Sequence, residues 1–397
     1  MMSVTSRREL LAVVAPRYRA ARGEERSRIL EEFVASTGYH RKYALSVLNH
    51  PITKGTARKK RVRPRQYVFA VQQALVTCWR ATNGICSKRL APYLPELVRV
   101  LEQHGELHLE AQTKARLLAL SPATADRLLQ AERTRAKPHG LGTTKPGTLL
   151  KSAIPIRTFA EWDEAEPGFT EIDLVVHCGT TTRGEYLHSL TVTDVATGWT
   201  ECVALRNRGQ QSVFQALVLA RGHLPFPLRG IDSDNGSEFI NAHLLRYCQD
   251  EQLTFTRSRP YKKNDQAYVE QKNWSIVRQL VGYERYESLS AYEALCALYE
   301  VVRLYVNFFQ PSMKLLTKER IGSKIKKTYD PAKTPYQRVL ESEQVSEEIK
   351  ACLRQQYATL NPVALLRQMQ RLQAVLWKLA VGEPVELETA QTAAATS

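Results

Sequence analysis

The spacing of hydrophobic positions predicts helices in the amino-terminal third of the chain. Residues 1–50 follow a helical period, in which apolar side chains recur every three or four positions. Within this stretch, the segment from Glu24 to Ala35 places three apolar side chains on one stripe, namely Ile29, Phe33 and Val34. The pattern therefore predicts an amphipathic helix that buries this stripe.

A second short helix is predicted from Tyr39 to Leu48, after a break at Ser36-Thr37-Gly38. Gly38 relieves the tight turn, and the two helices have helix-turn-helix spacing. An ordinary helical hairpin fits the same pattern. On the second helix, the side chains available for packing are Tyr43, Leu45 and Leu48, and those expected to stay outside and contact DNA are Arg41 and Lys42.

Helical spacing returns over residues 67–136, with helices predicted at 68–82, 90–104 and 113–120. Ser121 is a good N-cap and Pro122 a good first helical residue, so another helix begins there after a short turn. This arrangement is a second helix-turn-helix candidate, whose exposed Thr124 and Arg127 could meet base edges or phosphates. A capped helix without a recognition role is the commoner cause of such a pattern.

Two irregular segments separate these parts of the chain. Residues 54–66 are expected to form an extended basic linker that tracks phosphates or enters a minor groove, with DNA contacts from Lys59, Lys60, Arg61, Arg63 and Arg65. The alternative is a solvated run of charge with no partner. Residues 137–164 are interrupted by proline and glycine, which indicates an interdomain linker. Residues 1–53 and 67–136 are thus predicted to be separate DNA-binding domains.

The hydrophobic period changes toward strands near residue 165. Three β-rich runs with short loops predict an antiparallel meander, at 169–177, 186–193 and 199–205. Helices and strands then alternate, with helices at 211–222, 238–251 and 265–283 and strands at 228–233 and 253–257. The order βββαβαβα is that of the ribonuclease H fold. We therefore expect an α/β core with a mixed five-stranded sheet over residues 165–310, preceded by all-α domains.

Three acidic residues occupy chemically informative places in this order. Asp173 lies in the middle of the first strand among apolar neighbours, where an unpaired carboxylate is costly and needs a cation or a donor. Asp234 follows the short strand that contains Ile231, at the carboxyl end where α/β folds gather ligands. Glu270 lies on the long helix, and 35 residues separate it from Asp234.

Two other acids compete for the same role. Asp232 lies two residues before Asp234 and so points to the same face of a strand. Asp194 follows the second strand, where a turn residue is the simpler interpretation. The sequence alone leaves both open, and Asp234 is preferred on the family pattern described next.

The motifs around these acids resemble the integrase catalytic core that retroviral integrases share with many bacterial insertion-sequence transposases. They are Glu171-Ile172-Asp173, the run 232–239 (DSDNGSEF) and the run 263–273 (KNDQAYVEQKN). The segment from Tyr305 to Lys314 also looks like the one that follows this core in such transposases. Any single motif is weak, because Asp-Asn-Gly is also a common turn, but the three in this order and spacing are specific.

The resemblance implies a DNA transposase whose metal-binding and catalytic residues are Asp173, Asp234 and Glu270. Phosphodiester cleavage needs an activated nucleophile and a stabilised leaving oxyanion, and two Mg²⁺ ions can provide both. Hard oxygen ligands suit Mg²⁺, and Mn²⁺ is a candidate substitute. Asp173 would contact both ions, and the other two acids one each. The expected steps are hydrolysis that exposes a 3′-hydroxyl at a transposon end, and attack of this hydroxyl on target DNA.

The charge of the chain agrees with a nucleic-acid partner. The 56 Lys and Arg residues exceed the 40 Asp and Glu residues and leave a net charge of +16. Further DNA contacts are predicted in the loop before the last core helix, at Arg259, Lys262 and Lys263, and on that helix, at Lys272 and Arg278. A solvated helix edge is the alternative for the last two.

The remaining expectations concern location, assembly and the carboxyl-terminal part. No signal-peptide or membrane-spanning run is found, which favours a bacterial cytoplasmic, nucleoid-associated protein. Residues 311–397 contain a basic stretch from Lys314 to Lys327, and then amphipathic helical spacing from Ser346 to Lys378. Such helices could pair subunits, so a homo-oligomer is expected, whereas the sequence does not decide whether an accessory protein is required.

Two rival functions remain. One is a ribonuclease H-like nuclease that only hydrolyses, and the other is a non-catalytic DNA-binding regulator derived from a transposase. Two helix-turn-helix candidates favour recognition of specific DNA ends. The presence of all three carboxylates favours a catalytic protein.

Overall fold

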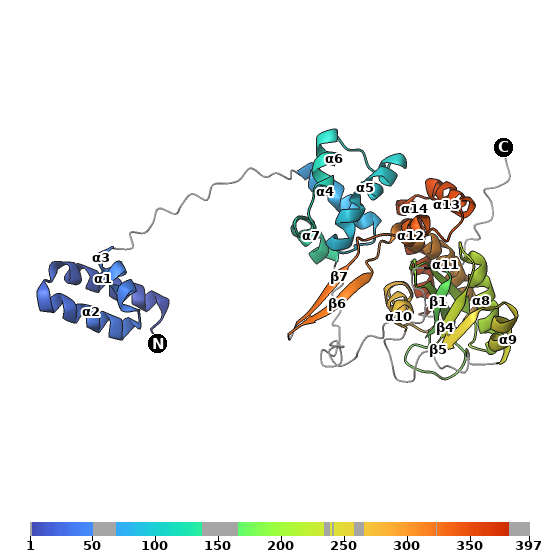
Figure 1. Ribbon diagram of the computed structural model, residues 1–397, viewed down its shortest axis with the longest axis horizontal. Helices are drawn as coiled ribbons and strands as arrows, with labels where there is room; N and C mark the ends of the chain where they lie inside the picture. The colour runs from blue at the N-terminus through green and yellow to red at the C-terminus, as the bar shows by residue number, and fades with distance from the viewer. Residues whose placement is uncertain are drawn as a thin grey trace. The chain divides into compact units, whose positions relative to one another are not determined.

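A computed structural model of the chain describes residues 2–50, 69–136, 166–233, 239, 242–257, 266–322 and 324–380 (Figure 1). The chain divides into two compact units, Met1–Gln66 and Tyr67–Ser397. Every helix within the described ranges is too short or too polar to cross a lipid bilayer.

The first unit contains three helices, α1 (Val4–Ala20), α2 (Gly23–Thr37) and α3 (Arg41–Asn49). The helix predicted from Glu24 is confirmed, and its Ile29 and Phe33 are buried. Gly38 ends α2 with a φ of 68°, and its N–H donates to the carbonyl of Val34 (2.9 Å), which is a left-handed C-cap that favours glycine.

The packing of α3 differs from the sequence prediction at one position. Tyr43 was expected to pack, but it is 51% exposed. The buried face of α3 is formed instead by Ala44, Val47 and Leu48, whose spacing places Tyr43 at its margin. The Tyr43 ring makes an edge-on contact with Tyr39 (4.9 Å between centroids). The cationic residues of the first turn, Arg41 and Lys42, are exposed.

The second unit begins with four helices, α4 (Phe69–Ala81), α5 (Ser87–Gln103), α6 (Ala111–Leu118) and α7 (Pro122–Ala136). The predicted start of α7 is confirmed, because the Ser121 hydroxyl accepts from the N–H of Thr124 (3.2 Å). Arg127 is exposed, and its guanidinium donates to the hydroxyl of Thr124 (3.1 Å). These helices share an apolar core of their own, centred on α4 and α5.

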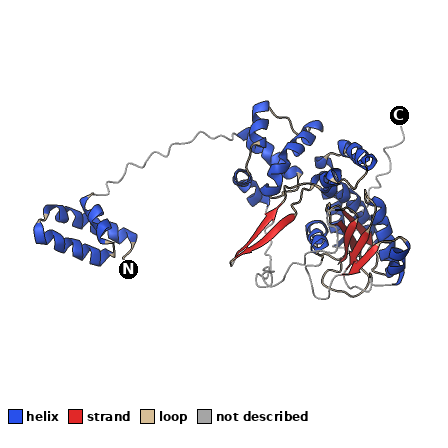
Figure 2. Cartoon of the chain, in the orientation of Figure 1, coloured by secondary structure: helices blue, strands red, loops and turns tan. Residues whose placement is uncertain are grey.

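A five-stranded sheet follows, formed by β1 (Phe169–Val176), β2 (His188–Asp194), β3 (Thr200–Leu205), β4 (Gly230–Ser233) and β5 (Thr254–Arg257) (Figure 2). The strand order is β3-β2-β1-β4-β5. The first three strands are antiparallel, whereas β4 and β5 run parallel to β1. This topology is that of a ribonuclease H-like core, so the predicted fold class is confirmed.

Helices cover both faces of the sheet. They are α8 (Gln210–His223), α9 (Ala242–Asp250), α10 (Ala267–Lys272) with its continuation η1 (Asn273–Arg278), and α11 (Leu289–Phe309). One core joins β2, β3 and β4 to α8 and α9, and another joins the sheet to η1 and α11. The long helix predicted over 265–283 is therefore present in part: it is α-helical up to Lys272 and then widens to a π-helix.

The carboxyl-terminal part contains a feature for which the sequence pattern predicted no strand. The basic stretch forms a hairpin of β6 (Leu315–Ile321) and β7 (Lys324–Tyr329). Three helices follow, namely α12 (Pro335–Glu341), α13 (Glu347–Thr359) and α14 (Pro362–Ala380). The last two confirm the helical spacing noted after Ser346. They pack with α11 in one apolar core.

Asn307, on α11, fixes this helix to the edge strand of the sheet. Its side chain is fully buried and makes two hydrogen bonds with the backbone of Thr200, at the start of β3. The amide oxygen accepts from the N–H of Thr200 (2.9 Å), and the amide nitrogen donates to its carbonyl (2.9 Å). Both polar groups of an edge residue are thereby satisfied inside the protein.

Replacing Asn307 should therefore destabilise the core. In Asn307→Ala, two buried backbone groups lose their partners, and we expect the free energy of unfolding to fall by about 2–4 kcal/mol. Urea unfolding followed by circular dichroism measures the change. The control is Gln368→Ala at an exposed position of α14, where the change should stay within about 0.5 kcal/mol. Equal stability of the two variants would refute the role assigned to Asn307.

Candidate active site

The central strands β1 and β4 bring several acidic residues to one face of the sheet. Their parallel register pairs Glu171 with Asp232 and Ile172 with Ser233. Side chains of paired residues point to the same face of a sheet, as do side chains two positions apart on one strand. Glu171, Asp173 and Asp232 therefore share a face at the centre of the sheet.

Asp173 is half-buried and is held by donors from two directions. One carboxylate oxygen accepts from the N–H of Leu174 (2.8 Å), and the other accepts from the side-chain amide of Asn273 (2.6 Å). Asn273 lies three residues after Glu270, so both residues lie on the same side of the helix. The contact thus turns the side of the helix that carries Glu270 toward Asp173.

Glu171 is fully buried and holds the first turn of α10. Its Oε2 atom accepts hydrogen bonds from the N–H groups of Tyr268 (2.9 Å) and Val269 (2.8 Å). Burial raises the pKa of this carboxyl to about 8; the nearby carboxylates of Asp232 and Glu270 act in the same direction, and the two hydrogen bonds oppose them. Burial therefore favours the protonated form of this group. The contact fixes the first turn of α10, the helix that carries Glu270, against β1.

Asp232 is also buried, but its surroundings differ from those of Asp173. Its Oδ1 atom accepts from the hydroxyl of Thr256 on the neighbouring strand β5 (2.7 Å). Asp232 is paired with Glu171 rather than with a residue beyond the strand end. It therefore lies inside the sheet, two residues before the position that follows Ser233. The next acid, Asp234, lies outside the described residues.

Asp194 fulfils the turn role expected of it. One carboxylate oxygen accepts from the N–H and the hydroxyl of Thr197 (2.7 and 2.6 Å), and the other accepts from the N–H of Gly168 (2.8 Å). Burial raises its pKa, and these bonds oppose the rise. Asp194 closes the turn between β2 and β3 and ties it to the start of β1.

The predicted DNA contacts on the active-site helix lie in different environments. Lys272 is half-buried, and burial lowers its pKa to about 8, which makes it a weaker candidate for a phosphate contact. Arg278 is half-buried and its guanidinium lies 4.6 Å from the centroid of the Tyr283 ring. Glu270 itself is exposed. The predicted contacts in the basic linker (Lys59, Lys60, Arg61, Arg63 and Arg65) and in the loop (Arg259, Lys262 and Lys263) lie outside the described residues.

Three residues with clear roles were given none by the sequence argument: Glu171, Asn273 and Thr256. Two of them were visible in the motifs, because Glu171 lies two residues before Asp173 and Asn273 three after Glu270. A buried strand with two acids on one face calls for two sets of partners. That signal could have identified Glu171, but only the structure shows that its partner is the start of α10.

The carboxylate oxygens at this site are ligands that suit a hard divalent cation. The described carboxylates offer oxygen ligands, whereas a zinc or copper site would use histidine or cysteine. Among the described residues, no group of three or more His, Cys, Asp or Glu side chains is arranged to bind a metal ion. Since Asp234 is outside that set, a trio that includes it is compatible with this finding.

The comparisons with known proteins agree with this core. Residues 163–263 match the family model described as integrase core domain, so the central domain of the chain is an integrase-type core. The "Uncharacterized protein y4rM" of Sinorhizobium fredii (strain NBRC 101917 / NGR234) is 45% identical over 338 residues, which cover 85% of this chain and 96% of that protein. The chain belongs to the same family as y4rM.

Two solved structures match this chain at low sequence identity and low TM-score. One is the HTLV-2 integrase catalytic core domain in complex with magnesium, which is 16% identical and aligns with 37% of this chain and 90% of its own (TM-score 0.27). The other is a simian T-cell lymphotropic virus intasome in complex with the PP2A regulatory subunit B56 gamma. It is also 16% identical and aligns with 54% of this chain and 69% of its own (TM-score 0.31).

The role of Glu171 can be tested without an activity assay. Glu171→Ala removes the acceptor for two N–H groups, so the amide hydrogens of Tyr268 and Val269 should exchange faster and the free energy of unfolding should fall by about 2–4 kcal/mol. Glu171→Gln keeps a carbonyl oxygen in place and resembles the protonated acid, so protection should be largely kept. Hydrogen exchange measured by NMR makes the comparison. If both variants protect these amides as the wild type does, Glu171 does not anchor α10.

Proposed function

We propose that this chain is a DNA transposase that cleaves phosphodiester bonds at transposon ends and joins the exposed 3′-hydroxyl to target DNA. The observation that carries the proposal is the contact of Asn273 with Asp173 (2.6 Å). This contact turns the helix that carries Glu270 toward a carboxylate of the central strand in an integrase-type core. The hydrogen bonds of Glu171 to the first turn of α10 support the same arrangement.

Asp173, Asp234 and Glu270 are the proposed metal ligands. Asp234 directly follows Ser233, which is paired with Ile172, and consecutive Cα atoms are only about 3.8 Å apart. The pairing of Ser233 with Ile172, the residue before Asp173, supports the choice of Asp234 as the second ligand. When bound, two Mg²⁺ ions would activate the attacking water or hydroxyl and neutralise charge on the leaving oxygen, and Mn²⁺ is the candidate substitute.

The protein's own residues would position these ligands and the DNA. Asn273 orients Asp173 by a hydrogen bond. Glu171 fixes the first turn of the helix that carries Glu270. Thr256 binds Asp232 within the sheet. The excess of cationic residues supports a double-stranded DNA partner. The described candidates for end recognition by the amino-terminal helices are the exposed Arg41, Lys42 and Arg127 and also Thr124, which was expected to be exposed but is half-buried. We infer that the protein acts as a homo-oligomer in the bacterial cytoplasm.

The proposed ligand set predicts that each of its three carboxylates is required for activity. Asp173→Asn, Asp234→Asn and Glu270→Gln should each lower cleavage and strand transfer on the order of 10³-fold or more, because several kcal/mol of charge stabilisation in the transition state are lost. Asp232→Asn is the matched control, since an amide oxygen can still accept from Thr256. The assay uses, as substrate, the DNA ends that flank the gene, in the presence of Mg²⁺. Gel shift measures binding to the same ends in parallel.

The products separate the three candidate functions. Joined products indicate a transposase, cut products alone indicate a nuclease, and binding without either indicates a regulator. Loss of end binding in the ligand variants, equal to the loss of cleavage, would contradict the separation of the metal site from the recognition helices. Activity that depends on Asp232 and not on Asp234 would overturn the proposed ligand set.

A further inference from the structure

The hairpin of β6 and β7 is exposed along its whole described length. Each described side chain from Leu315 to Tyr329 is exposed, and the two strands project from the core as a ribbon (Figure 2). Several apolar side chains are among them, including Leu316 at 63% and Ile325 at 46% exposure. A two-stranded ribbon without a covered face is marginally stable in water. Its persistence as a separate ribbon calls for a partner on at least one face.

The charge of the ribbon indicates the chemistry of that partner. Residues 315–329 contain five cationic residues and one acidic residue. The antiparallel register places Lys318 directly opposite Lys327, and Arg320 opposite Ile325. Like charges opposite one another destabilise a strand pair. Among the described residues, no ion pair involves Lys318, Arg320 or Lys327.

The two faces of the ribbon differ in charge. Alternation along the strands places Lys318, Arg320 and Lys327 on one face, which we call the cationic face. The opposite face carries Glu319 beside Lys326, flanked by the pair of Thr317 and Thr328. The cationic face thus carries three positive charges and no acid, whereas on the opposite face Glu319 offsets part of the charge of Lys324 and Lys326.

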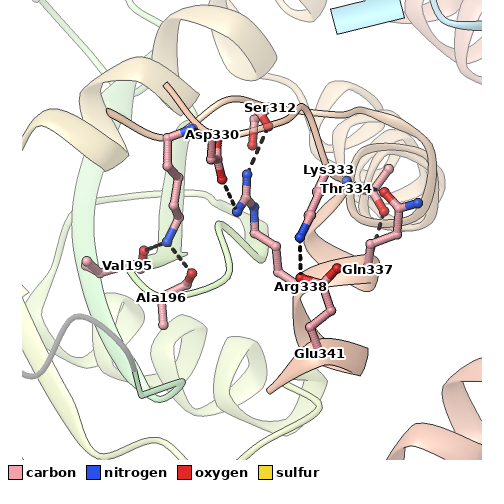
Figure 3. Close-up of polar contacts among 10 residues, drawn as sticks. Val195, Ala196, Ser312, Asp330, Lys333, Thr334, Gln337, Arg338 and Glu341 are labelled. Carbon is pink, nitrogen blue, oxygen red and sulfur yellow. Dashed lines mark hydrogen bonds and ion pairs between the residues drawn. The ribbon is translucent and has the colours of Figure 1, made fainter. Parts of the chain in front are cut away.

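The base of the hairpin is fixed firmly to the catalytic core. The carboxylate of Asp330 accepts from the N–H of Lys314 (2.5 Å) and from the guanidinium of Arg338 (2.6 Å), and Arg338 also donates to the carbonyl of Ser312 (3.0 Å) (Figure 3). The ammonium of Lys314 donates to the carbonyls of Val195 (2.6 Å) and Ala196, in the turn after β2. The exposed ribbon is therefore attached to a rigid support.

The same base lies near the candidate active site. The Lys314 ammonium lies 6.0 Å from the ring centroid of Tyr268, the residue of α10 whose N–H is held by Glu171. A partner that binds the ribbon is thereby placed close to the catalytic helix. A ribbon anchored at its base next to an active site is a means of orienting a long substrate.

We propose that the β6–β7 ribbon is a binding arm for duplex DNA, with its cationic face against the phosphate backbone. DNA binding by the ribbon does not depend on the proposed function. Only the purpose of the arm, which is to orient DNA at the active site, rests on that function. The major groove of B-form DNA, about 12 Å wide, admits a two-stranded ribbon, whereas the deep and narrow major groove of duplex RNA does not. Pairing of the ribbon with the ribbon of a second copy would set two cationic faces against each other, which repulsion disfavours.

The test is the salt dependence of DNA binding by the full chain. The probe is a fluorescent DNA duplex of arbitrary sequence, and the dissociation constant is measured by anisotropy over a series of salt concentrations. Lys318→Gln/Lys327→Gln should weaken binding and reduce the slope of log affinity against log salt by about 2, one for each lost phosphate contact. Since both side chains are exposed and repel each other, the double variant should be at least as stable as the wild type.

Two matched controls isolate the ribbon. Arg371→Gln/Lys378→Gln removes two exposed cations from α14 and should leave the slope unchanged. Lys326→Gln, on the opposite face, should change the slope less than Lys327→Gln at the next position. An unaltered slope in Lys318→Gln/Lys327→Gln, or the same loss in the α14 variant, overturns the proposal. If the chain binds duplex RNA as tightly as duplex DNA, and Lys318→Gln/Lys327→Gln weakens both to the same extent, the assignment to a DNA groove is overturned.

The outcome is independent of catalysis. If the chain neither cuts nor joins DNA but the ribbon variant loses affinity, the proposed function fails and the binding arm stands. If the chain joins DNA and the ribbon variant binds as the wild type does, the arm fails and the proposed function stands.

Discussion

The architecture of the core depends on how acidic side chains are accommodated on the two central parallel strands. Carboxylates that share one face of a sheet repel one another and lose hydration on burial. Each is compensated by a different element: Glu171 by the first turn of α10, Asp173 by Asn273, and Asp232 by Thr256. The position of the helix that carries Glu270 follows from the first two of these contacts.

Much of the fold could be predicted because the elements that form it bury apolar side chains in regular patterns. β-rich runs separated by turn residues identified the strands around Asp173, helical spacing identified α2 and the carboxyl-terminal helices, and the N-cap Ser121 identified the start of α7. The β6–β7 hairpin escaped prediction because it has no buried face, and therefore no hydrophobic alternation to detect. Tyr43 was misplaced because the apolar stripe of α3 is centred on Ala44, Val47 and Leu48.

The candidate site was predictable in its acids and not in the contacts that orient them. Asp173 was marked by its place in an apolar strand, and the family resemblance supplied Asp234 and Glu270. The anchoring role of Glu171 depends on backbone groups 97 and 98 residues further along the chain. Such pairing is a property of the folded chain. The half-burial of Lys272 likewise follows from the packing of α10, which a helical pattern does not determine.

The central claim is that Asp173, Asp234 and Glu270 together bind divalent cations. Anomalous diffraction from crystals of the full chain grown with Mn²⁺ tests it most directly, because the ion is located without reference to activity. We expect metal peaks at about 2.0–2.2 Å from carboxylate oxygens of all three residues. Peaks bound by Asp232 in place of Asp234, or a bound ion that Glu270 does not reach, would contradict the account.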